Sequence, residues 1–378
     1  MNEFQLNLYS DLFALANSNE AFFFKDQELD NSVYRVFSYR LASYSDFCAP
    51  GAFESRGIMF EMDQETPIRL AAMPMEKFFN DSENPFTMNL DYNTIQQVML
   101  KMDGSLMSTY MHNGELRIKS KTALASDHAI NAMRWLDLPE NKEYKDELTS
   151  ITEIEFTVNM EYTSPEPYMR IVIGYQEPKL TILNIRSTFT GRYLPKEDID
   201  VKYFPEILNH WVEQITVEDG PEFVKSIADM TGIEGYVIQL KSGQHVKKKT
   251  FWYSALHHTK DSVTNPRRLY EVVLDEASDD LRLMFADDPY SLKAIEDMEI
   301  LVGGWYNHLV KTVEDFHHKY KDADRKTYAI AGQAELDKRG FAIAMLKYQN
   351  KAFSYKEMMK KWYKEFGLED TSLTLTEE

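Results

Sequence analysis

The spacing of apolar residues changes near residue 260 of the 378 in the chain. From about residue 20 to 60 and from 90 to 250, short β-branched and aromatic runs alternate with turn signals, which predicts strands with interspersed helices. Later apolar residues recur at helical spacing. Because the chain exceeds what one hydrophobic core usually holds, we expect two domains. The sequence predicts an α+β fold: antiparallel sheets with helices over residues 1–254, then an all-helical domain over residues 255–378.

Several local signals predict individual elements. Apolar and polar residues alternate from Ile154 to Tyr162, which predicts a strand with one apolar and one polar face and a Glu161 side chain that points away from the core. Ser126 and Asn265 each precede a helical pattern and are expected to act as N-caps. The first domain is therefore expected to mix strands and helices.

Composition limits the function classes that need considering. The single cysteine, Cys48, excludes an internal disulfide and a Cys-x-x-Cys zinc site. Neither a charged-then-apolar N-terminal segment nor a run of about 18 apolar residues is present. We therefore expect a cytoplasmic protein without membrane contact. The net charge of −19 disfavours uniform attraction to nucleic acid, so basic clusters must be considered locally.

The most specific chemical signal is the tetrapeptide Lys101, Met102, Asp103 and Gly104, which follows an apolar run. This context predicts a lysine at the end of a strand, just before a tight turn at Asp103-Gly104. A lysine amine attacks phosphorus only when it is neutral, and neighbouring cations or partial desolvation favour that form. Lys101 is therefore a candidate nucleophile.

Two basic clusters could supply those cations. Residues 241–249 contain four lysines and no acidic residue, and strand alternation puts Lys247 and Lys249 on one face with Lys248 opposite. A second row of alternating basic residues consists of Arg117, Lys119 and Lys121. Alone, each signal is weak, because a Lys-x-Asp-Gly sequence occurs by chance and a basic run is usually a solvated surface.

The combination and order of these motifs resemble the covalent nucleotidyltransferases, which include ATP-dependent ligases and mRNA-capping enzymes. The further motifs lie at residues 159–162, 170–177, 233–237 and 246–249. More specifically, the chain resembles the RNA ligase 1 family of T-even phages, the tRNA-repair ligases, along nearly its whole length. That likeness is strongest at residues 34–39, 54–63 and 74–89, and it continues through 252–253, 277–281 and 324–329.

The resemblance implies an ATP-grasp-like nucleotidyltransferase domain and an ATP-dependent RNA ligase. Lys101 would carry AMP, transfer it to an RNA 5′-phosphate, and allow a 3′-hydroxyl to attack the activated end. The implied cofactors are ATP and Mg²⁺, with Mn²⁺ as an alternative metal. The implied partner is RNA, such as a cleaved tRNA recognised by the helical domain, and the protein is expected to be a monomer in a phage-infected host.

The resemblance also implies roles for particular residues. The expected catalytic residues are Lys101, Lys247, Lys249, Glu161 and Glu234. Nucleotide contacts are expected from Tyr39, Arg56, Lys77, Phe79, Asp103, Gly104, Lys119, Lys121, Tyr175, Gly235 and Tyr253. The expected metal ligands are Glu161, Glu234, Asp279 and Asp280.

Structural roles remain open for several of these residues. Arg56 and Lys77 could form ordinary surface ion pairs. The aromatic side chains of Tyr39, Phe79 and Tyr175 could belong to the core. Glu161 and Glu234 could merely balance nearby lysines. For Asp279 and Asp280 we favour a helix N-cap over a metal site, and the same holds for Asp287 and Asp288.

The alternative functions are a DNA ligase, a GTP-using capping enzyme and a nucleic-acid-binding module that has lost catalysis. DNA ligases and capping enzymes normally follow the lysine domain with a strand-rich OB-fold module, whereas the second domain here is predicted to be helical. Loss of catalysis would require a missing motif residue, and none is missing. Two departures from the phage pattern are Met102, in place of an acidic residue, and Lys248, in place of an apolar one.

Overall fold

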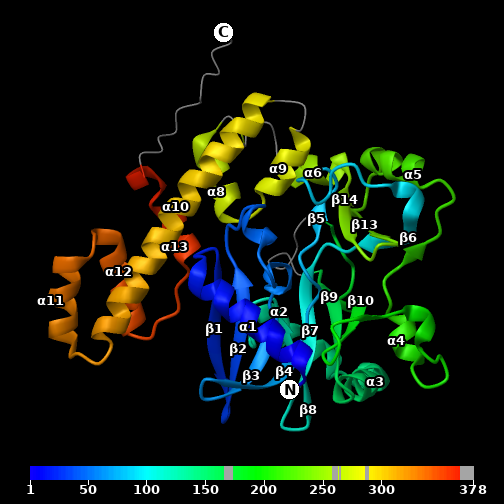
Figure 1. Ribbon diagram of the computed structural model, residues 1–378, viewed down its shortest axis with the longest axis horizontal. Helices are drawn as coiled ribbons and strands as arrows, with labels where there is room; N and C mark the ends of the chain where they lie inside the picture. Colours follow the sequence, from blue (N-terminus) through cyan, green and yellow to red (C-terminus); the bar gives the residue numbers. More distant parts are fainter. Residues whose placement is uncertain (166–172, 258–262, 264, 286–288, 367–378) are drawn as a thin grey trace. The chain divides into compact units, whose positions relative to one another are not determined.

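The computed structural model describes residues 1–165, 173–257, 263, 265–285 and 289–366. The chain divides into two compact units, residues 1–257 and residues 258–378 (Figure 1). All described strands lie in the first unit, and the described regular structure of the second unit is helical, which confirms the predicted α+β class. The expected boundary at 254/255 falls inside helix α6 (Phe251–His257), three residues before the division at 257/258.

The first unit contains a four-stranded antiparallel sheet in the order β1-β2-β3-β4. Its strands are β1 (Phe22–Leu29), β2 (Ser32–Tyr39), β3 (Met59–Asp63) and β4 (Thr66–Ala72). Helix α1 (Glu3–Ser18) begins with a capping box in which the Asn2 side chain and Gln5 bond reciprocally. Leu8 and Leu12 of α1 pack against Phe37, Phe60 and Leu70 of the sheet. Burial of this apolar face fixes the helix on the sheet.

A five-stranded sheet has the order β11-β10-β9-β7-β8. Its strands are β7 (Ser105–His112), β8 (Glu115–Ser120), β9 (Phe156–Thr163), β10 (Lys179–Ser187) and β11 (Tyr193–Leu194). Asn113 and Gly114 join β7 to β8 with positive φ at both positions, as a two-residue hairpin turn requires. Helices α2 (Asp127–Leu136) and α3 (Lys142–Glu153) pack on this sheet and complete its core.

A second five-stranded sheet has the order β12-β6-β13-β14-β5. Its strands are β5 (Phe79–Asn80), β6 (Ile95–Lys101), β12 (Gln214–Ile215), β13 (Gly235–Leu240) and β14 (His245–Lys249). All pairs are antiparallel except β14 with β5, which is parallel. Helix α5 (Gly220–Ser226) contributes to its core, and α4 (Pro205–Asn209) contributes to the core of the other five-stranded sheet.

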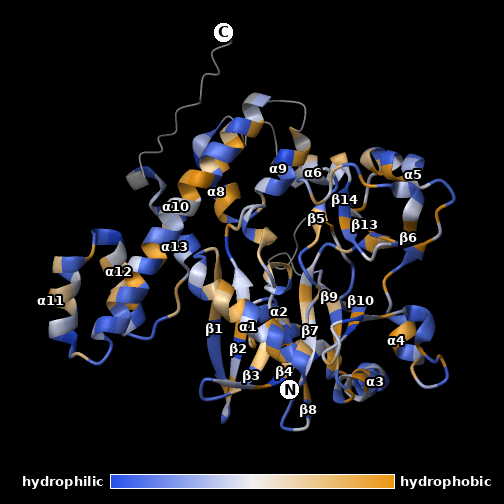
Figure 2. Ribbon diagram, viewed as in Figure 1, coloured by the Kyte–Doolittle hydropathy of each residue, from blue (hydrophilic) through white to orange (hydrophobic). Residues whose placement is uncertain are grey.

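The second unit consists of helices on which hydrophobic and hydrophilic residues are interspersed (Figure 2). They are α8 (Pro266–Leu274), α9 (Ser278–Met284), α10 (Pro289–Tyr320), α11 (Arg325–Glu335), α12 (Lys338–Tyr348) and α13 (Tyr355–Lys361). Asn265 caps α8 by accepting from the backbone N–H of Arg268, as predicted, and Ser126 likewise caps α2. No helix in the described ranges is long and apolar enough to cross a membrane.

The predicted alternation of apolar and polar residues on β9 is present, with Val158, Met160 and Tyr162 in the core. The polar face is covered as well: Asn159 is buried and donates to the backbone carbonyl of Met73, and Thr157 accepts from the backbone N–H of Met73. The tight turn expected at Asp103-Gly104 is wrong, because these residues instead connect β6 of one five-stranded sheet to β7 of the other.

Candidate active site

Lys101 is the last residue of β6, at the point where the chain leaves one five-stranded sheet for the other. Its Nζ lies 2.7 Å from Oε1 of Glu234. The Glu234 side chain is almost fully buried, whereas Lys101 keeps about a fifth of its side-chain surface exposed. A buried carboxylate thus fixes the position of a lysine whose side chain remains partly exposed.

Gly235 makes this arrangement sterically possible. In β13 it pairs with Lys101 of β6 on one side and with Lys249 of β14 on the other. Its φ is +148°, and a Cβ at this position would lie 2.0 Å from the backbone oxygen of Lys248. A side chain here would force the strands apart, so only glycine allows this close approach.

Glu234 also contacts a second lysine. Nζ of Lys249 lies 3.4 Å from the same Oε1 that pairs with Lys101, and 5.3 Å from the ring centroid of Tyr253. Strand alternation places Lys247 on the same side of β14 as Lys249. Lys101 of β6 and Lys249 of β14 therefore share a single buried carboxylate, and Lys247 lies on the same side of β14 as Lys249.

Lys248 points to the opposite face of β14. Its Nζ lies 2.7 Å from Oδ2 of Asp81, and the hydroxyl of Tyr92 donates to Oδ1 of the same carboxylate. The extra positive charge that distinguishes this sequence from the phage pattern is therefore neutralised locally, away from Lys101.

Glu161 approaches Lys101 from the other five-stranded sheet. Its Oε1 accepts a hydrogen bond of 3.1 Å from the backbone N–H of Gly104. Burial raises the pKa of Glu161 to about 7; the charge of Lys101 opposes this shift, while the neighbouring Glu234 adds to it. A Cβ on Gly104 would lie 2.4 Å from the backbone oxygen of Tyr162, so this contact too requires glycine.

Asp103 anchors the segment that follows the lysine. Its Oδ1 accepts from the hydroxyl of Tyr253 at 2.8 Å, and its Oδ2 accepts from the backbone N–H of Ile173 at 2.7 Å. The backbone N–H of Asp103 donates to the hydroxyl oxygen of Tyr175, whose pKa burial raises to about 12. Asp103, Tyr175 and Tyr253, all expected at the nucleotide site, are thus joined in one buried network. Residues 170–172 of the predicted 170–177 motif lie outside the described residues.

Cations and aromatic rings meet at the end of β2. Nζ of Lys121 lies 4.4 Å from the ring centroid of Tyr39, and Nζ of Lys77 lies 5.8 Å from the same ring and 5.0 Å from that of Phe79. Phe79 is buried and packs against Phe47, whereas Tyr39 is half-buried. The structure therefore brings together four residues that the resemblance assigned to nucleotide contact.

The predicted basic row on β8 is not a surface row. Lys119 is fully buried, and its Nζ donates to the backbone oxygens of Gly57, Ser120 and Lys121 at 2.8, 2.8 and 3.3 Å. Burial lowers the pKa of Lys119 to about 7. The amino group of Lys119 therefore has three carbonyl partners inside the protein. We assign Lys119 a structural role in place of the expected nucleotide contact: it links Lys121 to Gly57, the residue that follows Arg56.

Arg56 itself acts on Glu161, whose pKa its positive charge lowers against the effect of burial. Arg56 follows η2 (Ala52–Glu54), and its backbone N–H donates to the carbonyl of Glu54 at 2.7 Å. Arg56 is half-buried, and its charge belongs to the same electrostatic environment as Lys101 and Glu161.

The expected metal ligands are divided between the two units, with Glu161 and Glu234 in the first and Asp279 and Asp280 in the second. Glu161 and Glu234 interact electrostatically beside Lys101. Within the described ranges, no three His, Cys, Asp or Glu side chains cluster as a metal cage. Two carboxylates suit Mg²⁺ that arrives with nucleotide phosphates, because this ion keeps several waters and takes few protein ligands.

Asp279 and Asp280 lie in the first turn of α9, where negative charge favours the helix dipole. The helix begins at Ser278 after an N-cap at Ala277 that makes no side-chain capping bond, so the N-cap we favoured is not formed. Asp287 and Asp288 lie outside the described residues.

Sequence reasoning missed two residues that hold the site together. Asp81 is the partner of Lys248, and Arg186 bonds to the segments that precede Arg56 and Lys77. The sequence did contain a sign of this role for Arg186. It is a charged residue near the end of the largely apolar strand β10, and a buried charge requires a partner. Two of its partners, Pro74 and Glu54, are 112 and 132 residues away in sequence, so their identity could not be inferred.

Replacing Glu161 with Gln should change how stability depends on pH. The pKa of Glu161 in the folded protein, about 7, lies above the ordinary carboxyl value of about 4.3. Between these two pH values, Glu161 is therefore protonated in the folded state and ionised in the unfolded state. Wild-type stability should therefore fall relative to Glu161→Gln as pH rises from about 4.5 to about 7. Urea unfolding of both proteins at pH 4.5 and pH 8, without nucleotide or magnesium, measures this difference; a pH-independent difference would contradict it.

The chain is similar to known RNA ligases along most of its length. A family model described as "RNA ligase" matches residues 54–258, and one described as "T4 RNA ligase 1, C-terminal domain" matches residues 260–370. RNA ligase 1 of bacteriophage TS2126 is 27% identical over 79% of this chain and 74% of its own length. A putative RNA ligase of Thermovibrio ammonificans is 24% identical over 82% of this chain and 80% of its own.

Solved structures also resemble the chain. A putative ATP-dependent DNA ligase from Aquifex aeolicus has a TM-score of 0.44 and 14% identity, with 82% of this chain and 81% of that chain covered. An apo form of Naegleria gruberi RNA ligase has a TM-score of 0.37 and 14% identity, with 53% of this chain covered. The match spans 65% of the Naegleria chain, less than two thirds of its length. Since the two family models together match nearly all residues from 54 to 370, the chain belongs to the RNA ligase family that includes T4 RNA ligase 1.

Proposed function

We propose that this protein is an ATP-dependent RNA ligase that joins an RNA 5′-phosphate to a 3′-hydroxyl through AMP carried on Lys101. The observation that carries the proposal is the pairing of Lys101 and Lys249 on either side of Gly235, with Glu234 between them. This arrangement supplies an amine nucleophile, a cation for a charged phosphate and a proton acceptor within one small region. Membership of the RNA ligase family supports the choice of reaction.

In the first step, the Nζ of Lys101 attacks the α-phosphorus of ATP. A P–N bond forms, the bond to the bridging oxygen breaks, and pyrophosphate leaves. The amine must lose a proton, and Oε1 of Glu234 lies 2.7 Å away as the acceptor. Lys249 and Lys247 are on the side of β14 where they can offset the negative charge that develops on the phosphate and leaving group.

The second and third steps use the same face of the sheet. An oxygen of the RNA 5′-phosphate attacks the AMP phosphorus and breaks the P–N bond, which regenerates Lys101 and leaves AMP on the RNA end. The RNA 3′-hydroxyl then attacks the activated 5′-phosphorus, and AMP leaves as the phosphodiester forms. Glu161 and Glu234 would hold Mg²⁺ or Mn²⁺ together with the substrate phosphates, where the cation would reduce phosphate charge.

We assign recognition of the RNA to the second unit. The proposed substrates are breaks in structured RNA, such as a cleaved tRNA. The proposed active form is a monomer in the cytoplasm. The match of residues 260–370 to a ligase C-terminal domain supports that role. The helical character of the described second unit disfavours a capping enzyme or DNA ligase that relies on an OB-fold module.

The first test is covalent nucleotide transfer in the absence of RNA. Wild type and Lys101→Ala are incubated with magnesium and either ATP or GTP, and intact mass is measured. We expect wild type to gain the mass of one AMP from ATP only, and the variant to gain none, because it lacks the amine. A GMP gain would indicate a capping enzyme, and no gain by folded wild type would favour a binding module.

Lys249 and Lys248 provide a matched pair of adjacent lysines with different surroundings. Lys249→Ala should slow AMP transfer to the protein roughly 10²- to 10³-fold, because a cation facing the reacting phosphate is lost. Lys248→Ala should retain near wild-type transfer, since its ammonium faces Asp81 on the other side of the strand. Single-turnover rates at saturating ATP measure the effect, and equal losses in the two variants would refute the assignment of faces.

A further inference from the structure

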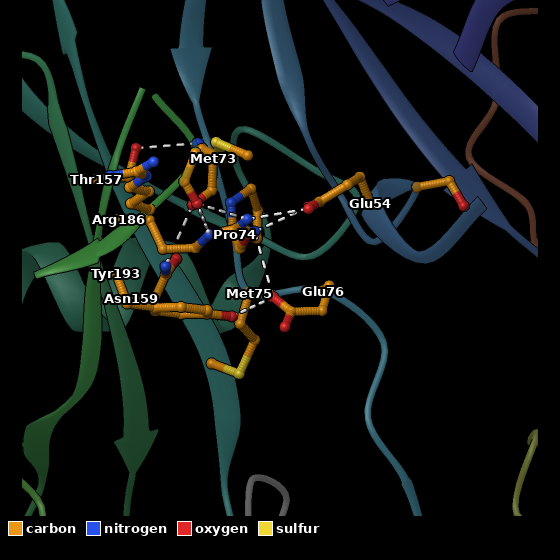
Figure 3. Close-up of polar contacts among 12 residues, drawn as sticks. Glu54, Met73, Pro74, Met75, Glu76, Thr157, Asn159, Arg186 and Tyr193 are labelled. Carbon is orange, nitrogen blue, oxygen red and sulfur yellow. Dashed lines mark hydrogen bonds and ion pairs between the residues drawn. The ribbon is translucent and has the colours of Figure 1, made fainter. Parts of the chain in front are cut away.

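Arg186 lies in β10, and its buried side chain reaches into a polar cluster between the sheets (Figure 3). Its Nη1 and Nη2 donate to the two carboxylate oxygens of Glu54 at 2.8 and 2.9 Å. Nη1 also donates to the backbone oxygen of Pro74 at 2.7 Å, and Nε and Nη2 both donate to that of Gly191. One planar guanidinium thus fixes three chain segments.

Two of these segments lead directly to candidate phosphate-contacting residues. Glu54 precedes Arg56 by two positions, and the connection is tightened by the bond from the Arg56 N–H to the Glu54 carbonyl. Pro74 and Glu76 precede Lys77 in the segment between β4 and β5. Arg186 therefore binds the Glu54 side chain just before Arg56 and the Pro74 backbone just before Lys77.

Glu76 extends the cluster to the sheet that carries Lys101. One of its carboxylate oxygens accepts from the hydroxyl of Tyr193, and it lies 3.5 Å from Nη1 of Arg186. Its other oxygen is 3.7 Å from Nδ1 of His245, in β14, the strand that also contains Lys247 and Lys249. Segments associated with all three sheets consequently meet around Arg186.

The β9 strand secures the same segment from behind. Thr157 accepts through Oγ1 from the N–H of Met73, and Asn159 donates to the Met73 carbonyl (Figure 3). A buried ion pair contributes little net stability compared with apolar packing, because desolvation offsets the attraction. A bidentate Arg–carboxylate pair does restrict orientation strongly. The cluster therefore suits alignment more than stabilisation.

We propose that Arg186 is a positioning residue for the outer phosphates of ATP, acting through Glu54 and Glu76 on Arg56 and Lys77. This inference rests on the proposed function. Arg186 acts in only one of the three steps, the formation of lysyl-AMP, when the β- and γ-phosphates are present. It does not matter for sealing of an RNA end that already carries AMP, because pyrophosphate is then absent.

The test separates these steps in Arg186→Lys, which keeps the charge but loses the planar fork, and in Arg186→Gln. Two quantities are measured: KM for ATP in lysyl-AMP formation, and the rate of sealing 5′-adenylylated RNA without ATP. We expect KM for ATP to rise roughly tenfold or more, because an Arg-to-Lys change is not conservative at a bidentate site. Sealing should remain within about twofold of wild type.

Arg35→Lys is the matched control. Arg35 is also buried and forms a bidentate pair, with Asp26 at 2.8 Å, but its other side-chain bonds go to Tyr9 and Glu65. This variant should leave KM for ATP near the wild-type value. If a variant of Arg186 does not fold, Tyr193→Phe removes only the hydroxyl that donates to Glu76, and it should raise KM for ATP in the same direction to a smaller extent.

The outcomes distinguish this inference from the function on which it rests. An unchanged KM for ATP, or a parallel fall in lysyl-AMP formation and sealing, would overturn the role of Arg186 while leaving the ligase assignment intact. Failure of wild type to form lysyl-AMP would instead overturn the proposed function, and the role of Arg186 with it.

Discussion

The close approach of three strands at Gly235 is the constraint on which the candidate site depends. Lys101 and Lys249 can share the Glu234 carboxylate only because the strand between them has a glycine, Gly235, where it pairs with both lysines. The Glu234 carboxylate is buried, so its charge requires these cations, and they in turn are held in place by it. Backbone sterics and electrostatics thus specify the same arrangement.

The second feature of the site is the crossing between sheets. Because residues 102–104 carry the chain from β6 to β7, Lys101 lies where Glu161 of the neighbouring sheet can approach it. The network around Asp103 then fixes the crossing. Buried cations support the surrounding segments: Lys119 binds backbone oxygens near Arg56, and Arg186 binds the residues before Arg56 and Lys77. In a chain of net charge −19, such local placement of basic groups matters more than their total.

Much of this could be predicted from local patterns, and the exceptions have physical reasons. The helical second unit, the caps at Ser126 and Asn265, and the opposite faces of Lys248 and Lys249 follow from periodicity and short-range chemistry. Period-two alternation could not reveal that both faces of β9 are covered, because burial depends on which segments pack on the sheet. It also could not reveal that Lys119 is buried, since the carbonyls that accept from it include that of Gly57, which is 62 residues away.

The central claim, that Lys101 is a carrier of AMP between ATP and RNA, is tested most directly by a single-turnover transfer. Protein bearing AMP is purified free of ATP, mixed with magnesium and an RNA that has a 5′-phosphate and a 3′-hydroxyl, and quenched over time. AMP should leave the protein, appear on the RNA 5′ end, and then be released as sealed RNA forms, with one AMP freed per bond. AMP that stays on the protein, or is released without adenylylated or sealed RNA, would contradict the claim.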